Sequence, residues 1–427
     1  MPDKATRLDP RQARQVLHID FDSFFASCEQ QFNSKLRGKP IGVTAQNGRT
    51  CIIAASKEAK KLGIKSPSRT QDALEKVPDM IFVPAHFEKY WEITQQFLNI
   101  CKDYSPFVEL FSLDEVFIDV TATETLYGGK YQLINKIKER IKNEIGEYVT
   151  VSVGISHNRL LAKLASGLNK PNGIFEITPQ NLDEVYEKAK LTDICGIGER
   201  VGIRLNKIGI YSLLDLRKVS VWILEEEFGK VYSQILKNIG IGKDESGITP
   251  YYQAPEVKSV GRNYCLPRNE YDKRAVFQNV YELCEEVAIK LRRLSKKART
   301  VSFYLGGSSS THARKTVSGY FDSGQDIFNI CMNILKQNNF NFGNRDYVRR
   351  ISVGASSLED VSNISLSLFP HDVKKHKLFE TVDKINEKYG DHTIRNGFLL
   401  YADKLTTVPN GFLADKYERT KLSLLEF

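Results

Sequence analysis

Short apolar runs alternate with helix-length amphipathic segments over the first 177 residues, and this alternation limits the possible folds more than any other feature of the chain. Residues 15–20 form the first apolar run, and a helical pattern follows from Ser23. Residues 88–104 have the spacing of a long amphipathic helix. Because alternating strands and helices pack as layers around one core, the pattern predicts a mixed α/β domain.

The rest of the chain divides into segments of different character. We expect the polar residues 1–14 to be disordered, and residues 178–245 to be helical with glycine-punctuated turns. Residues 246–257 contain Gly, Pro and polar residues typical of a linker. Beyond them the sequence predicts strands at 257–266, 299–305 and 347–355 and helices at 273–294 and 324–336.

The charge of the chain favours an anionic partner. The 427 residues carry a formal net charge of +9, and residues 258–370 hold 17 Lys and Arg against 10 Asp and Glu, a net charge of +7. Nucleic acid is the usual partner of such a surface. No apolar run approaches the roughly 20 residues of a membrane helix. The seven cysteines include no C-x-x-C pair, so we expect no zinc site.

Three acidic residues lie beside apolar runs: Asp20 ends the first run, and Asp114 and Glu115 are adjacent to each other. Neighbouring side chains of a strand point to opposite faces, so both acids of the pair reach one site only from a tight hairpin turn. Converging carboxylates need cations, and hard oxygen ligands select Mg²⁺ or Mn²⁺. Two such ions suit in-line phosphoryl displacement. Taken singly, each acid is better explained as a hairpin tip or a helix cap.

Residues 20–29, 38–43, 111–119 and 154–173 resemble motifs of the Y-family DNA polymerases, in the same order and with the same spacing. The resemblance extends over residues 15–370. Within the family, residues 47–60 and Cys28 look nearer to the catalytic subunit of polymerase V (UmuC type) than to polymerase IV (DinB type).

The resemblance implies an α+β multidomain fold shaped like a right hand. It implies a ferredoxin-like palm, small fingers, a helical thumb with a helix-hairpin-helix and an α/β little finger. The expected domains are the palm at 15–24 and 88–177, the fingers at 25–87, the thumb at 178–245, the linker at 246–257, the little finger at 258–360 and a tail at 361–427.

The resemblance also implies the metal ligands. Asp20, Asp114 and Glu115 would be the catalytic carboxylates that bind two Mg²⁺ ions, which Mn²⁺ could replace, and the carbonyl oxygen of Phe21 would be a further ligand. Two other acids of the motifs, at positions 22 and 119, are expected to be structural rather than ligands.

Five residues are expected at the incoming nucleotide. Phe24 and Phe25 would border it, and Phe25 falls where the family has its steric gate, an aromatic ring that excludes a ribose 2′-OH. Without the family, Phe25 fits a core position equally well. Lys170 matches a lysine suited to a β- or γ-phosphate. Lys57 and Lys60 stand where many members carry tyrosine and arginine, and they would supply charge to the triphosphate.

DNA contacts are expected from the thumb and the little finger. Gly196 and Gly198 lie in a helix-hairpin-helix pattern whose backbone N–H groups can hold a phosphate without reading sequence. Basic and small polar residues on predicted strands would follow the phosphate backbone; they are Ser259, Gly261, Arg262, Arg299, Arg349 and Arg350.

The tail contains a segment, 364–370, that resembles the peptide with which bacterial polymerases bind the sliding clamp. Its apolar anchors would be Leu366, Leu368 and Phe369, and Ser365 stands where glutamine is usual. Accessory subunits of a UmuC-type complex are further expected partners, and we expect a cytoplasmic protein associated with the nucleoid.

Three functions are compatible with a palm of this kind. The first is a lesion-bypass polymerase that adds deoxynucleoside triphosphates to primer-template DNA. The second is a non-catalytic Y-family adaptor, but such relatives usually lack the acidic triad that this chain retains. The third, a cyclic-nucleotide synthase, would need neither a thumb hairpin nor a basic little finger. The sequence therefore favours the polymerase.

Overall fold

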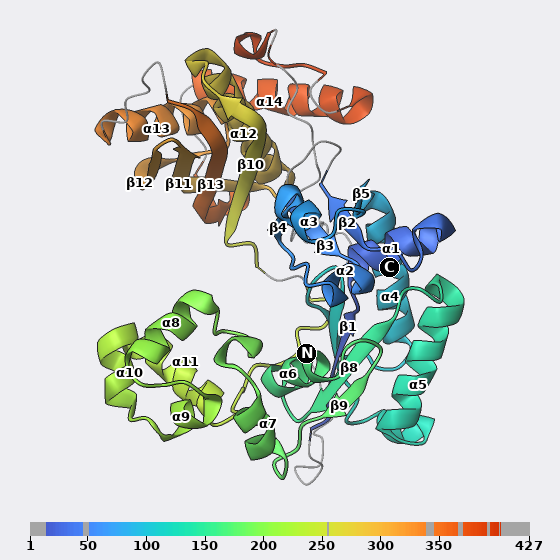
Figure 1. Cartoon of the computed structure of the whole chain (residues 1–427). Coiled ribbons are helices and arrows are strands. Elements are labelled where there is room, and N and C mark those ends of the chain that lie inside the picture. Colours follow the sequence, from blue (N-terminus) through green and yellow to red (C-terminus); the bar gives the residue numbers. More distant parts are fainter. Residues whose placement is uncertain are drawn as a thin grey trace, which may run out of the picture. The chain divides into compact units, whose positions relative to one another are not determined.

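The computed structural model of the chain describes residues 14–45, 51–253, 256–338, 346–365, 370–390, 393–400 and 402. These residues divide into two compact units, the first ending at residue 253 and the second beginning at residue 256 (Figure 1). The boundary falls within the predicted linker. None of the described helices is both long and apolar enough to span a membrane.

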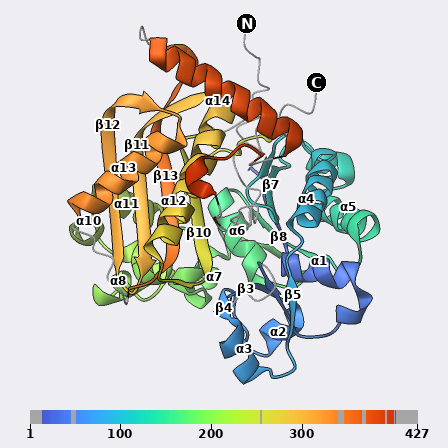
Figure 2. The same ribbon diagram turned by 90° about the horizontal axis from the view of Figure 1, so that it is seen from above.

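The first unit is built on a five-stranded sheet with the order β6-β7-β1-β8-β9. The central strand β1 (Val16–Phe21) pairs antiparallel with β7 (Glu115–Asp119) and β8 (Val151–Ser156). The outer strands are β6 (Val108–Leu110) and β9 (Ile174–Glu176). Because β1 is central and helices cover both faces of the sheet (Figure 2), its residues are almost entirely buried and read as an apolar run.

Helices cover both faces of this sheet. The helices α4 (Phe87–Lys102) and α5 (Lys130–Arg140) lie on one face, and α6 (Arg159–Leu168) lies on the other (Figure 2). A π-helical turn, Ile141–Ile145, continues α5. The order β6-β7-β1-β8 with two helices on one face is that of a ferredoxin-like βαββαβ unit, which confirms the expected palm.

Helix α6 packs unusually close to β8 because Gly154 has no side chain. A Cβ atom at this position would lie 2.0 Å from the carbonyl oxygen of Ala162 and 2.3 Å from the amide nitrogen of Ser166. The glycine therefore lets α6 rest directly on the sheet, and the residues of α6 come within reach of β1.

A smaller sheet with the order β4-β3-β2-β5 forms the region expected to be the fingers. It contains β2 (Ile41–Thr44), β3 (Cys51–Ala55), β4 (Ser68–Arg69) and β5 (Ile81–Pro84). Helix α1 (Phe24–Phe32) leads into it from β1, and α2 (Lys57–Lys61) and α3 (Thr70–Lys76) pack on its own small core.

The region expected to be the thumb is entirely helical in the structure. It consists of α7 (Leu182–Lys188), α8 (Glu199–Lys207), α9 (Leu213–Lys218), α10 (Val221–Phe228) and α11 (Lys230–Gly240). These helices share a separate apolar core. Within it, the hydroxyl of the buried Tyr186 donates to the carbonyl of Ile239 at 2.7 Å.

The second unit contains a four-stranded antiparallel sheet with the order β10-β13-β11-β12. Its strands are β10 (Ser259–Glu270), β11 (Lys296–Gly307), β12 (Ser310–Phe321) and β13 (Val348–Asp360). The helices α12 (Lys273–Arg293) and α13 (Gly324–Gln337) pack against it around an apolar core. The strand β12 was not predicted, because it has few apolar residues and pairs only along one edge.

Part of the predicted tail packs on this second unit. Helix α14 (Pro370–Tyr389) is joined to α12 by two hydrogen bonds from Arg292 to Asp383, at 2.5 and 2.7 Å. Farther along, the Gln278 side chain donates to the carbonyl of Phe398 at 2.8 Å. The helical side of the second unit therefore extends beyond residue 360.

Candidate active site

The register of the central strands brings the predicted carboxylates together. β1 and β7 place Asp20 directly opposite Glu115. Asp114 lies in the turn before β7, and its carbonyl accepts a hydrogen bond of 3.0 Å from the N–H of Phe21. The Ser112 hydroxyl donates to Asp114 Oδ1 at 2.6 Å. The hairpin turn that the sequence requires is thus present, and both of its acids lie beside the end of β1.

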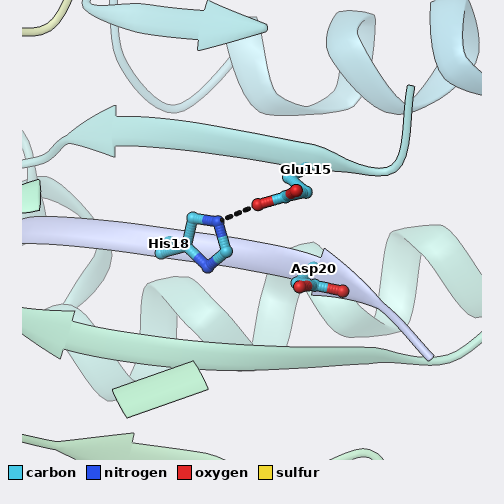
Figure 3. Close-up of side chains that lie close together, drawn as sticks. All are labelled: His18, Asp20 and Glu115. Carbon is cyan, nitrogen blue, oxygen red and sulfur yellow. Dashed lines mark hydrogen bonds and ion pairs between the residues drawn. The ribbon is translucent and has the colours of Figure 1, made fainter. Parts of the chain in front are cut away.

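A histidine joins this group. His18 and Asp20 lie two residues apart on β1 and project to the same side, toward Glu115 (Figure 3). The three side chains offer ligand atoms that all lie within 4.8 Å of one another. The His18 ring contacts Glu115 Oε2 through Nε2 at 2.8 Å and the Ser166 hydroxyl through Nδ1 at 2.7 Å. The ring is fully buried, so these two contacts fix its orientation.

Two lysines supply positive charge to the carboxylates. Lys170 Nζ donates to Asp20 Oδ1 at 2.7 Å. Lys163, on α6, forms an ion pair with Glu115. Lys163 was not predicted, nor was His18. A lysine on an amphipathic helix and a histidine in an apolar run carry no local signal of a site, and their partner Glu115 is 48 and 97 residues away in the chain.

The lysines neutralise the site unevenly. Burial raises the pKa of Asp20 to about 6, although Lys170 opposes the shift. Burial also raises the pKa of Asp114, and the neighbouring Glu115 adds to the effect. At Glu115 burial acts in the same direction, but hydrogen bonds from His18 and Lys163 outweigh it and hold the pKa at about 2. Burial lowers the pKa of His18 to about 4, so the ring is neutral at pH 7.

These carboxylates fit divalent cations. They are oxygen ligands on one side of a sheet, and burial raises the pKa values of Asp20 and Asp114, so a bound cation would stabilise their charged forms. Mg²⁺ and Mn²⁺ prefer such carboxylate sets. The Phe21 carbonyl belongs to the last residue of β1, next to Asp20.

The remaining predicted lysines lie near the same site. Lys57 Nζ donates to the Thr150 hydroxyl at 2.7 Å. Burial lowers the pKa of Lys60, and the positive charge of Lys170 lowers it further. The charge of Asp20 acts on Lys60 in the opposite direction, so Lys60 lies within electrostatic reach of both Asp20 and Lys170. The structure thus brings Lys60 and Lys170 to the carboxylates, and it brings Lys57 to Thr150.

The two predicted aromatic residues begin α1. Phe24 stacks on Phe21, with ring centroids 4.9 Å apart. Phe25 stacks on Tyr90 of α4 at 4.6 Å, and the residue is 8% exposed. Both rings are thus part of an aromatic core beside the end of β1.

In the thumb region, the predicted glycine turn precedes helix α8. Gly196 has φ +99°, a conformation that other residues rarely adopt, and Gly198 is the residue at the N-terminus of α8. The Tyr232 hydroxyl donates to the Gly196 carbonyl. The turn and helix α8 correspond to the hairpin and the second helix of the expected motif, and its contact with DNA stays a prediction.

The predicted basic residues of the second unit differ in exposure. Arg350 is exposed and lies 5.7 Å from the ring centroid of Tyr304, while Arg299 and Arg349 are half-buried. Ser259 and Gly261 occupy exposed positions of β10.

Arg262 is different. Its side chain is 7% exposed and forms an ion pair with Glu286 of α12. It occupies the face of β10 that also carries the buried Val260 and Tyr264, because every second residue of a strand points the same way. Arg262 thus faces the helices, contrary to its predicted contact with DNA. The predicted clamp-binding residues Leu366, Leu368 and Phe369 lie outside the described residues.

Comparisons with known proteins identify the family. Residues 19–167 match the model of the impB/mucB/samB family, and residues 257–368 match that family's C-terminal domain. DNA polymerase IV of Pelotomaculum thermopropionicum is 30% identical over 89% of this chain and 94% of the relative. DNA polymerase IV of Clostridium perfringens is 32% identical over 82% of this chain and 96% of the relative.

A solved structure agrees with these relatives. The Y-family DNA polymerase chimera Dbh-Dpo4(243-245)-Dbh has a TM-score of 0.68 and 26% identity, over 81% of this chain and 99% of the chimera. The named relatives are of the polymerase IV type, so the finer expectation of a UmuC-type chain stays a prediction. Two matching family domains, relatives matched over nearly their whole length and a shared architecture lead to one conclusion: this chain belongs to the Y family of DNA polymerases.

Proposed function

We propose that this chain is a template-directed DNA polymerase of the lesion-bypass type, which adds deoxynucleotides to a primer 3′ end by two-metal phosphoryl transfer. Relatives named DNA polymerase IV and a palm of the Y-family kind support this function. The observation that carries the proposal is the convergence of Asp20, Asp114 and Glu115 on one side of the β1–β7 pair. An adaptor would have no need for this set.

The three carboxylates and the Phe21 carbonyl are the residues that would hold two Mg²⁺ ions. Bound there, the ions would activate the primer 3′ oxygen and stabilise the charge of the leaving pyrophosphate. Glu115 is held in place by His18 and Lys163, and Asp114 by Ser112. The ligands therefore need little rearrangement, which is how an enzyme keeps its reacting groups in position.

The lysines would bind the triphosphate. Lys170 donates to Asp20 in this structure, and a divalent cation at Asp20 would free its ammonium group for a phosphate oxygen. Lys57 and Lys60 would add positive charge from α2. Phe25 would exclude ribonucleotides through its aromatic ring, and Phe24 contacts that ring from the start of the same helix.

Primer-template DNA is the expected macromolecular partner. The turn at Gly196 and Gly198 would hold a phosphate through backbone N–H groups, and the basic residues of the second unit would add salt-dependent affinity. The sliding clamp, through residues 364–370, and accessory subunits of a UmuC-type complex remain predicted partners. A cytoplasmic, nucleoid-associated location remains a prediction that follows from the proposed DNA binding.

Primer extension tests the proposal. The purified chain, given Mg²⁺, a primer-template and the four deoxynucleoside triphosphates, should extend the primer on an undamaged template. It should also insert a nucleotide opposite a template lesion such as an abasic site. An adaptor would bind the same DNA, measured by fluorescence anisotropy, without extending the primer. Binding without extension under all of these conditions would refute the proposed activity.

A further inference from the structure

Asp22 is a buried acid that none of the expected site roles includes. It follows β1 and is 3% exposed, although it lies two residues from Asp20. A carboxylate is rarely buried unless donors surround it. Three donors do so here: the Ser152 hydroxyl to Oδ1 at 2.7 Å, the Thr150 hydroxyl to Oδ2 at 2.7 Å and the Asn172 N–H to Oδ2 at 2.8 Å.

Two of these donors connect Asp22 to lysines of the proposed triphosphate site. Thr150 donates its hydroxyl proton to Asp22, and the same oxygen accepts a hydrogen bond of 2.7 Å from Lys57 Nζ. The carboxylate therefore orients Lys57 through one hydroxyl. The negative charge of Asp22 also acts directly on Lys57 and Lys60, raising the pKa of each against the lowering effect of burial.

Asn172, the other of these two donors, connects Asp22 to Lys170. Asn172 adopts φ +57°, a backbone conformation that asparagine tolerates better than most residues, and this geometry lets its N–H donate to Asp22. The carbonyl of Asn172 accepts a hydrogen bond of 2.6 Å from Lys138. The turn is thus held on both sides of Asn172, and Lys170 lies two residues before it, with its Nζ at Asp20.

We propose that Asp22 is a positioning residue for the incoming nucleotide, which fixes Lys57 and the Lys170 turn so that both lysines meet the triphosphate. Asp22 does not touch the nucleotide or the metal ions. This inference rests on the proposed polymerase function. It goes beyond that function by assigning a role to an acid that otherwise only stabilises the junction of β1 and β8.

A positioning role and a purely structural role of Asp22 predict different kinetics. A residue that positions triphosphate ligands acts on nucleotide binding, so its loss raises the Kd of the nucleotide and leaves the rate of the bound complex nearly unchanged. A residue that only stabilises the sheet changes the temperature of unfolding and leaves the Kd of the remaining folded enzyme as it was.

Single-turnover incorporation with the full chain, primer-template DNA and Mg²⁺ separates these possibilities. Asp22→Asn keeps the shape of the side chain and removes its charge. We expect it to raise the apparent Kd of the deoxynucleoside triphosphate about tenfold and to change the incorporation rate constant less than about twofold. Thr150→Val, which disconnects Lys57 alone, should raise the Kd by a smaller factor. Ser152→Ala removes a hydroxyl that contacts no lysine, and it should raise the Kd less than Thr150→Val.

Double variants give the decisive comparison. Because Asp22 acts through the lysines, the effect of Asp22→Asn should largely disappear in a Lys57→Ala/Lys170→Ala background. The inference is overturned if Asp22→Asn raises the Kd equally in both backgrounds, or if it lowers the rate constant with an unchanged Kd. Failure of the wild type to incorporate any nucleotide would instead refute the proposed function, so the two failures are distinguishable.

Discussion

The palm site and the sheet of the second unit use charge in opposite ways. In the palm, a few buried or half-buried carboxylates and lysines are each held by named hydrogen bonds, such as Lys170 to Asp20 at 2.7 Å. In the second unit, residues 258–370 carry a net charge of +7 that many residues of its strands and helices share. A buried charge acts through one geometry, whereas surface charges act together and are screened by salt. Chemistry should therefore depend on single residues of the palm, and DNA affinity should depend on the sum of many residues.

Removal of divalent metal gives the largest expected effect and separates the two regions. With a chelator in excess, nucleotide incorporation should fall to background, because Asp20 and Asp114 would lose the cations that neutralise them. DNA binding without nucleotide, measured by anisotropy, should stay within about twofold, since Lys and Arg provide it. Added Mn²⁺ should restore incorporation. Incorporation that persists in chelator would show that the palm works without the metals assigned to it.

Loss of the buried His18 should lower the metal affinity of the palm without removing a metal ligand. His18→Ala leaves Glu115 without one of its two partners, and loss of such an outer contact typically lowers metal affinity by about 10- to 100-fold. Mn²⁺ binding followed by electron paramagnetic resonance, with DNA and nucleotide present, measures this directly. His18→Asn, which retains a donor, should recover part of the affinity. Equal Mn²⁺ affinity in wild type and His18→Ala would contradict the role given to the ring.

The gate prediction concerns specificity rather than rate. Phe25→Ala should lower the preference for deoxyribonucleotides over ribonucleotides by about 10- to 100-fold, because the ring would no longer meet a 2′-OH. The ratio of kcat/KM for the two sugars is the measurement. Phe303→Leu, a change at a buried ring of the second unit, controls for loss of stability and should leave the ratio as it is. An unaltered ratio in Phe25→Ala would make Phe25 a core residue only.

Two arginines of the second unit test whether DNA affinity depends on exposed rather than buried residues. Arg350→Ala should weaken DNA binding by only a few-fold and lower the salt slope of log K by about one. Arg262→Ala should leave that slope unchanged. It should instead destabilise the second unit, by about 3–5 kcal/mol for breaking a buried ion pair. Anisotropy over a salt series and thermal unfolding test both, and a lower slope in Arg262→Ala would place that side chain on the DNA surface.

Local patterns predicted the elements that carry apolar residues. The run at 15–20 and the acid pair at 114–115 predicted β1 and the hairpin, since an apolar strand and a turn are both short-range features. The strand β12 was not predicted because its residues are mostly polar and it pairs only with β11. The pairing of β12 with β11 depends on residues of β11, so it cannot be read from the residues of β12 alone.

The carboxylates of the site were predictable from the sequence, but the residues that hold Glu115 in place were not. Asp20, Asp114 and Glu115 belong to motifs, whereas His18 and Lys163 gain their roles from a fold that brings α6 onto β1 through Gly154. Arg262 shows the reverse error. Val260, Arg262 and Tyr264 are every second residue of β10, so strand periodicity places Arg262 on the buried face. The prediction instead assumed that a charged residue faces solvent.

The most direct test compares two acids of one hairpin, Asp114 and Asp119, in primer extension with Mg²⁺. Asp114 lies in the turn beside Asp20, while Asp119, at the far end of β7, accepts hydrogen bonds from Arg14 and Thr121 at 2.8 and 2.5 Å. Asp114→Ala should reduce incorporation by at least about a thousandfold. Asp119→Ala should lower thermal stability and keep most of the activity. Equal incorporation by Asp114→Ala and the wild type would contradict the metal site at the centre of this account.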